Sequence, residues 1–237
     1  MKLALCIPAY NEEEIIVPTI AAVEAVLQDI PDLEWHLIVT DNASTDQTVE
    51  RVQELGDSQV AIMTLRQKGK GRAIRAAGEG VEADIFGFID ADLSAHPSSI
   101  LPLFEAIKTG AADIAIGSRL LDPTVVHRGV LRTASSQIFN MVRRWWLGVN
   151  VADSQCGLKL MNRRGLEILK KCKEDTWFLD IELLARAQKN GLRIVEVPIA
   201  WNEHHYPTRV SKLSMWKDSI GALRAFQRIR KNLRISS

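Results

Sequence analysis

The chain has 237 residues, of which 46% are hydrophobic and 25% are charged, and its formal net charge is +1. This composition argues against disorder and collagen-like repeats, and the near-zero charge argues against a nucleic-acid-binding protein with a wholly basic surface. No apolar run reaches the roughly 18 residues that a membrane-spanning helix needs, so neither a signal peptide nor a membrane anchor is expected. The three cysteines lack paired spacing, which favours a reducing, cytoplasmic environment.

Apolar runs alternate with helical periodicity over the first 117 residues. Strands are predicted at residues 3–9, 35–40, 60–65, 85–89 and 114–117. Helices are predicted at residues 12–27, between the turn at 41–46 and residue 55, and at 71–80. This alternation is typical of α/β proteins, in which a mostly parallel sheet carries helices on both faces.

Polar residues follow directly after these predicted strands. Ligands of parallel sheets bind beyond the carboxyl ends of the strands, so we expect the polar residues to converge on one crevice. They form five clusters, at residues 8–12, 41–46, 68–72, 90–92 and 117–119. Farther along, helices are predicted near residues 164–171 and 179–189, and a strand at 193–201. Without a Gly/Ser-rich linker or a repeat, the sequence predicts one domain over residues 1–213 and a helical extension over 214–237.

Two carboxylates, Asp90 and Asp92, follow the apolar run at 85–89. Alternate residues of an extended chain share a face, and neighbouring carboxylates repel each other unless a cation neutralises them. A divalent Mg or Mn ion, held by the two carboxylates and completed by substrate phosphates, would remove the repulsion. The alternative is a solvated pair that caps a helix after the strand.

Together, the polar clusters resemble the motifs of family 2 glycosyltransferases of the GT-A type. The resemblance rests on Pro8-Ala9-Tyr10-Asn11-Glu12, Asp41-Asn42-Ala43-Ser44-Thr45-Asp46, Lys68-Gly69-Lys70-Gly71-Arg72-Ala73, Asp90-Ala91-Asp92 and Gly117-Ser118-Arg119. Later motifs, at residues 153–159, 178–182, 196–198 and 209–212, are similar to those of dolichyl-phosphate or polyprenyl-phosphate mannosyl- and glucosyltransferases. The resemblance implies a Rossmann-like GT-A fold.

For the donor, the resemblance implies a nucleotide sugar. The base and ribose are then expected at Pro8, Ala9, Tyr10, Glu12 and Asp41. The diphosphate is expected at Lys70, Asp90, Ala91 and Asp92, through a divalent cation, with a loop that carries Arg209 and Lys212 closing over it. Ser94, where relatives often carry Gln, would be a weaker third metal ligand. Relatives usually have Asp-Gly after Asp41, where this chain has Asn42-Ala43.

For the acceptor, the resemblance implies a polyprenyl phosphate and an inverting displacement. A phosphate is already anionic, so it needs cations rather than a general base. Arg119 and Arg132 are the expected phosphate ligands, and with Asp92 they form the predicted catalytic set. The alternative is transfer to a saccharide or another hydroxyl, with Asp180 or Glu182 as the base. A non-catalytic subunit that keeps this fold is disfavoured, because it would be expected to lose the Asp pair.

Charge is distributed unevenly along the chain. Residues 209–237 contain 8 basic and 1 acidic side chains, whereas residues 1–208 contain 22 and 28. In this tail, Trp216, Ile220, Leu223 and Phe226 form an apolar stripe at helical spacing, which could lie on an anionic membrane or pack on the domain. Residues 139–147 interleave Arg and Trp, which suits a membrane interface or a buried helix that exposes Arg143 and Arg144.

These features predict an enzyme associated peripherally with the cytosolic face of a membrane. GDP-mannose is the favoured donor, because the architecture resembles the mannosyl branch, and UDP-glucose is the alternative. Polyprenyl phosphate is the expected acceptor. The other expectations are a separate membrane-protein partner and no nucleic-acid partner.

Overall fold

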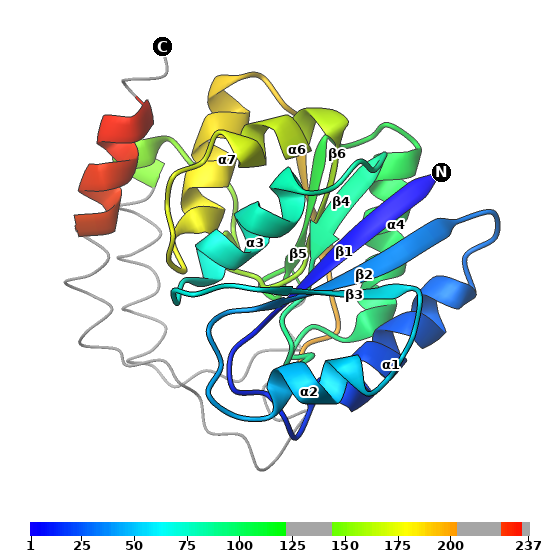
Figure 1. Cartoon of the computed structure of the whole chain (residues 1–237). Helices are drawn as coiled ribbons and strands as arrows, with labels where there is room; N and C mark the ends of the chain where they lie inside the picture. The colour runs from blue at the N-terminus through cyan, green and yellow to red at the C-terminus, as the bar shows by residue number, and fades with distance from the viewer. Residues whose placement is uncertain (122–143, 203–223, 234–237) are drawn as a thin grey trace.

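The computed structural model describes residues 1–121, 144–202 and 224–233, and in these residues seven strands form one sheet (Figure 1). The strands are β1 (Lys2–Ala9), β2 (Glu34–Asp41), β3 (Val60–Thr64), β4 (Ile85–Phe88), β5 (Ile114–Ser118), β6 (Lys159–Asn162) and β7 (Ile194–Pro198). Their spatial order is β3-β2-β1-β4-β6-β5-β7. All neighbouring pairs are parallel except those of β6, which is antiparallel to both β4 and β5. The predicted mostly parallel α/β sheet is confirmed.

Helices cover both faces of the sheet (Figure 1). They are α1 (Ile16–Gln28), α2 (Thr48–Gln53), α3 (Lys70–Glu79), the 3-10 helix η1 (Pro97–Ser99), α4 (Ile100–Lys108), α6 (Arg163–Lys170) and α7 (Leu179–Lys189). Because side chains alternate along a strand, Leu3 and Leu5 of β1 pack with α1 and α4, whereas Ala4 and Cys6 pack with α3, α6 and α7. The two faces therefore bury separate hydrophobic clusters.

Apart from the short 3-10 helix η1, the elements that were not predicted are α4 and β6. The helix has buried residues at Ile100, Leu103, Phe104 and Ile107, a helical spacing that the sequence does contain. The strand is only four residues long and begins at the charged Lys159, so it lacks the usual signal of an apolar run. Lys159 of this strand is the register partner of Phe88 in β4 and of Ile116 in β5. The strand therefore lies between β4 and β5, which were both predicted as strands of a mostly parallel sheet.

The strand order reverses beside β1. The chain runs from β1 through β2 to β3 in one direction, and then returns through α3 to β4 on the other side of β1. Register pairs such as Cys6–Phe88 bring the carboxyl ends of β1 and β4 next to each other. Ligands of open α/β sheets bind at such reversal points, so the fold places Ala9 and Asp90 where a binding crevice is expected.

Residues 224–233 form a helix that packs beside α7 (Figure 1). Its Ala225, Phe226 and Ile229 are buried in the cluster that contains α7. Lys189 Nζ donates a hydrogen bond to the Leu233 carbonyl at 2.9 Å. For Phe226 the packed alternative therefore holds, whereas Trp216, Ile220 and Leu223 lie outside the described residues. The division at residue 213 stays a prediction. Across the residues described, no helix combines the length and the apolarity needed to cross a membrane.

Candidate active site

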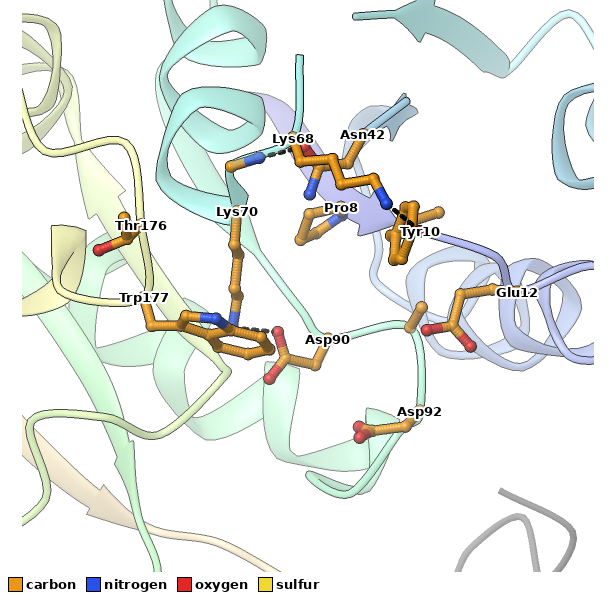
Figure 2. A pocket seen from close by; sticks show the side chains of 13 residues that line it. Pro8, Tyr10, Glu12, Asn42, Lys68, Lys70, Asp90, Asp92, Thr176 and Trp177 are labelled. Atoms are coloured by element: carbon orange, nitrogen blue, oxygen red, sulfur yellow. Dashed lines mark hydrogen bonds and ion pairs between the residues drawn. The ribbon is translucent and has the colours of Figure 1, made fainter. Parts of the chain in front are cut away.

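A cavity of about 380 Å³ lies at the carboxyl ends of β1, β2 and β4 (Figure 2). Four of the five predicted clusters contribute to its wall, and residues 117–119 do not. The lining residues are Pro8, Ala9, Tyr10, Glu12, Asn42, Lys68, Gly69, Lys70, Asp90, Ala91, Asp92, Thr176 and Trp177. A volume of this order suits a small ligand. Most of the residues expected to bind the donor therefore lie together.

The loop after β1 is held in place by the turn after β2. Ser44 Oγ accepts a hydrogen bond from the Asn11 backbone at 2.9 Å, and Asn11 Oδ1 accepts one from the Thr45 backbone at 2.8 Å. Thr48 Oγ1 accepts a third from the Glu12 backbone at 2.8 Å. Side-chain hydroxyls and amides in such turns satisfy backbone groups that no strand pairs. This interlock fixes the wall that carries Tyr10 and Glu12.

Asp41 is not part of the cavity wall. Its carboxylate is buried and accepts a hydrogen bond from the Ser44 backbone at 3.2 Å, so it supports the turn from within. The neighbouring Asn42 lines the cavity instead, and its Oδ1 accepts a hydrogen bond from the Gly69 backbone at 2.6 Å. The structure does not bring the expected base or ribose ligand Asp41 to the cavity, because its carboxylate is occupied by the turn.

Beside the loops after β1 and β2, the cavity is lined by the Lys68-Gly69-Lys70 loop and the first turn of α3. Lys68 Nζ contacts Tyr10 Oη and lies 4.0 Å from the centre of the Tyr10 ring. Lys70 Nζ forms an ion pair with Asp90 Oδ1 at 2.5 Å (Figure 2). Because α3 begins at Lys70, the positive end of the helix dipole faces the cavity, where it favours an anion.

Carboxylates dominate the charge around Lys70. Burial lowers the pKa of the Lys70 ammonium, but Asp90, Asp180 and Asp92 outweigh burial and hold it above its ordinary value. Burial raises the pKa of Asp90, and Asp92 and Asp180 raise it further against the opposing effect of Lys70. The loop after β4 is therefore short of positive charge, which suits a further cation.

Asp90 and Asp92 fit a divalent cation of the magnesium type, which needs one or two carboxylates plus phosphate or water oxygens. In the described parts of the chain, no three His, Cys, Asp or Glu side chains gather closely enough to hold a metal by themselves. Ser94, the expected third ligand, is buried and does not line the cavity. Its backbone N–H donates to Asp92 Oδ1 at 3.1 Å, so Ser94 supports Asp92 through its main chain.

Arg119 lies away from the cavity wall. Its Nε and Nη2 bind the two oxygens of Asp153 at 2.6 and 2.7 Å, and its guanidinium lies 4.6 Å from the centre of the Trp201 ring. Burial raises the pKa of Asp153, but the hydrogen bonds and charge of Arg119 outweigh burial and hold it below its ordinary value. Arg132, Arg209 and Lys212 lie outside the described residues, so their roles stay predictions.

Asp180 and Glu182, the candidate bases of the alternative function, are buried in ion pairs. Asp180 Oδ1 lies 2.6 Å from the fully buried Lys159 Nζ. Glu182 Oε1 lies 2.8 Å from Arg186 Nη2, and its Oε2 accepts hydrogen bonds from two backbone N–H groups. Neither residue lines the cavity.

Thr176 and Trp177 also line the cavity, and neither was predicted from the sequence. They lie between α6 and α7, far along the chain from the other lining residues. Trp177 is 47% exposed, and Lys70 Nζ lies 5.2 Å from the centre of its ring. Neither belongs to a polar cluster at the end of a predicted strand. Only the packing of the intervening loop on α3 could have revealed them.

Comparisons with known proteins show which family this chain belongs to. The family model of glycosyl transferase family 2 matches residues 4–169. The glycosyltransferase AglD of Haloferax volcanii is 30% identical over 226 residues, which cover 93% of this chain and 36% of that protein. The dolichyl-phosphate beta-glucosyltransferase of Saccharomyces cerevisiae is 28% identical over 240 residues, covering 92% of this chain and 71% of the yeast protein. The chain thus spans about a third of AglD.

The same fold occurs in solved structures. Glucosyl-3-phosphoglycerate synthase from Mycobacterium tuberculosis, solved with UDP, is similar with a TM-score of 0.71 and 20% identity over 98% of this chain and 80% of that chain. Its complex with Mn²⁺ and UDP-glucose gives a TM-score of 0.68, with 23% identity over 98% and 77%. The family match covers more than half of the chain and includes the loops after β1, β2, β3 and β4 that line the cavity, so this chain belongs to glycosyl transferase family 2.

Proposed function

We propose that this protein is an inverting glycosyltransferase that moves a hexose from a nucleotide diphosphate sugar to a polyprenyl phosphate. The observation that carries the proposal is the cavity at the reversal point of the sheet, where Asp90 and Asp92 face Lys70 and the start of α3. Such a site can bind a diphosphate in two ways. The carboxylates bind it through a divalent cation, and the lysines and the positive end of the helix dipole attract it directly. The name of the yeast relative supports a lipid-phosphate acceptor.

Each wall of the cavity then has a task. Tyr10 and Glu12, fixed by the interlocked loops, bind the nucleoside, with Asn42 beside them in place of Asp41. Lys68 and Lys70 bind the diphosphate and hold it against the carboxylates. A divalent cation at Asp90 and Asp92 would neutralise the leaving diphosphate. The crystallised synthase that shares this fold was solved with Mn²⁺ and UDP-glucose, which supports such a cation.

The buried ion pairs favour a phosphate acceptor over a hydroxyl. A hydroxyl acceptor requires a base within hydrogen-bonding reach of the proton that it removes. Asp180 and Glu182 are each engaged by a buried cation and lie outside the cavity lining. A phosphate oxygen attacks without a base, so it is compatible with this arrangement. Arg119 and Arg132 remain the proposed phosphate ligands.

The sugar is mannose or glucose. The architecture led us to expect GDP-mannose, whereas the yeast relative is named a glucosyltransferase, which favours UDP-glucose. Among the lining residues that the structure describes, none separates the two hexoses by itself, so the identity of the donor is the first thing to measure.

Labelled donors test the proposal directly. The protein is incubated with Mg²⁺ or Mn²⁺, polyprenyl phosphate and either radiolabelled GDP-mannose or UDP-glucose, and the lipid phase is extracted. We expect label in the lipid phase from one donor, and NMR of the product should show an inverted anomeric centre. Label that passes only to added saccharides would refute the lipid-phosphate acceptor.

Substitution of Asp92 tests whether the site binds a divalent cation. Asp92→Ala should lower transfer by roughly 100-fold or more, because a cation ligand at the site of charge development is lost. Binding of Mn²⁺ by the protein with UDP or GDP should weaken in parallel. Unchanged turnover with unchanged metal dependence would remove Asp92 from the site.

We also propose peripheral contact with a membrane. Trp145 is 88% exposed, Arg144 beside it is exposed, and Arg230 of the helix at 224–233 lies 6.0 Å from the Trp146 ring. An exposed indole beside cations suits the headgroup region of an anionic bilayer. Co-sedimentation with anionic liposomes should decrease for Trp145→Ala and at high salt. Binding that responds to neither change would argue against this surface.

A further inference from the structure

The cavity wall that carries Thr176 and Trp177 is a loop, residues 171–178, rather than the end of a strand. Figure 2 shows the Trp177 ring beside Lys70 and Asp90. Loops define a binding site only where neighbouring elements hold them in place. The elements that hold residues 171–178 therefore determine the shape of the site on this side.

Helix α3 contacts the loop at several points. Arg72 Nη2 lies 2.7 Å from Asp175 Oδ2, and Arg75 also pairs with Asp175. A Cβ at Gly71 would lie 2.6 Å from the Glu174 carbonyl oxygen and 2.7 Å from that of Thr176. Because Gly71 has no side chain, the loop backbone can lie directly on the helix.

The helix at 224–233 holds the loop from the other side. Arg228 Nη2 and Nε bind the Glu174 carboxylate at 2.9 and 3.2 Å, and Thr176 Oγ1 donates to the same carboxylate at 2.7 Å. The Phe226 and Phe178 rings meet edge to face, with centres 6.2 Å apart. One carboxylate thus connects the C-terminal helix to the residue that precedes Trp177.

The Arg228–Glu174 pair is unequal in its exposure. The Glu174 side chain is 3% exposed, whereas that of Arg228 is 52% exposed. An exposed ion pair contributes little, but a buried carboxylate that loses its cation has to rearrange or recruit water. Loss of Arg228 should therefore move Glu174 and the Thr176 that is bonded to it, more than it should destabilise the whole fold.

We infer that the helix at 224–233 positions Trp177 in the cavity through Arg228 and Glu174, and that donor affinity depends on this contact. The inference rests on the proposed function in one respect, that the cavity binds a nucleotide sugar. Arg228 and Glu174 are positioning residues, because neither lines the cavity.

The test compares Arg228→Ala with Arg224→Ala, which removes the same charge from an exposed position one turn earlier. Titration calorimetry with Mn²⁺ and UDP-glucose or GDP-mannose should show roughly three- to tenfold weaker binding for Arg228→Ala and less than about twofold for Arg224→Ala. In a Trp177→Ala background, Arg228→Ala should add less than about twofold, because the residue through which it acts is gone. Equal losses in both backgrounds would overturn the inference.

Hydrogen exchange provides a second readout that needs no ligand. Backbone amides at residues 173–177 should exchange faster in Arg228→Ala than in wild type, with Arg224→Ala unchanged and Arg228→Lys intermediate. Exchange at these amides that is the same in all four proteins would refute the positioning role. If the wild type binds neither donor, the proposed function fails, and the exchange comparison alone then decides whether the helix positions the loop.

Discussion

Asp90 owes its place beside Lys70 to a residue with no side chain. A Cβ at Gly157 would overlap Asp90 Oδ2 and Cγ, so only glycine lets the backbone before β6 pass this close to the carboxylate. The contact joins residues that are far apart in sequence, one in the loop after β4 and one just before the strand that pairs with β4. At the scale of single residues, the site depends on close backbone approach as much as on charge.

Gly157→Ala should therefore push the Asp90 carboxylate away from Lys70. We expect transfer to fall by roughly 10- to 100-fold, since small displacements of reacting groups are costly. Gly80→Ala is the matched control, because its Cβ would meet nothing closer than 3.6 Å. Circular dichroism should show both variants folded. Full activity in Gly157→Ala would mean that the position of Asp90 is unimportant.

At the scale of elements, Asp153 joins the end of β5 to β7. It binds Arg119, which follows β5, and its backbone N–H donates to Glu196 of β7 at 2.9 Å. The Asp153 side chain is 4% exposed, so the contact is shielded from water. Asp153 thus holds Arg119 beside β5 and the edge strand β7, and the role of Arg119 toward phosphate stays a prediction.

Asp153 should make the free energy of unfolding decrease as the pH falls into the acid range. Its folded pKa lies below the ordinary 3.8, so its contribution is present above about pH 3.8 and is lost as the pH falls through the folded pKa. Asp153→Asn should lower the free energy of unfolding by roughly 1–3 kcal/mol at pH 7, because Arg119 loses a charged partner. The difference from wild type should shrink in urea titrations below pH 4. A difference that is constant from pH 7 to pH 3 would contradict this assignment.

For the whole molecule, the C-terminal helix belongs to the folded domain as far as the structure describes it. Phe226 is 2% exposed and packs on Phe178, in the hydrophobic cluster that α3, α6 and α7 share with the sheet. The same helix carries the exposed Arg230 on its surface near Trp146. One face is therefore committed to the core, and only its other side is available to a membrane.

Phe226→Ala should lower the free energy of unfolding by roughly 3–5 kcal/mol, the usual effect of removing a buried ring. Gln227→Ala, at the neighbouring exposed position, should change it by no more than about 0.5 kcal/mol. Urea unfolding followed by fluorescence measures both. If the two variants are equally stable, the helix does not pack on the domain in solution, and the predicted boundary near residue 213 gains support.

Much of the site could be read from strand ends alone. Tyr10, Lys70, Asp90 and Asp92 follow predicted strands, and all line one cavity. The positions of Asp41 and Ser94 were not predictable in this way, since a polar residue after a strand can face the ligand or support the turn. In both cases, hydrogen bonds within the turn, which leave no periodic signal, determine which way the residue faces.

The sequence by itself determined the order of strands and helices as far as β4, the α/β class and the placement of the Asp pair, because apolar periodicity and strand ends are local properties. Only the tertiary structure decided that β6 lies between β4 and β5, that Trp177 lines the cavity and that Phe226 packs on the domain. Each of these depends on contacts between distant segments. The sequence around a residue does not specify which distant segment of the chain will pack against it.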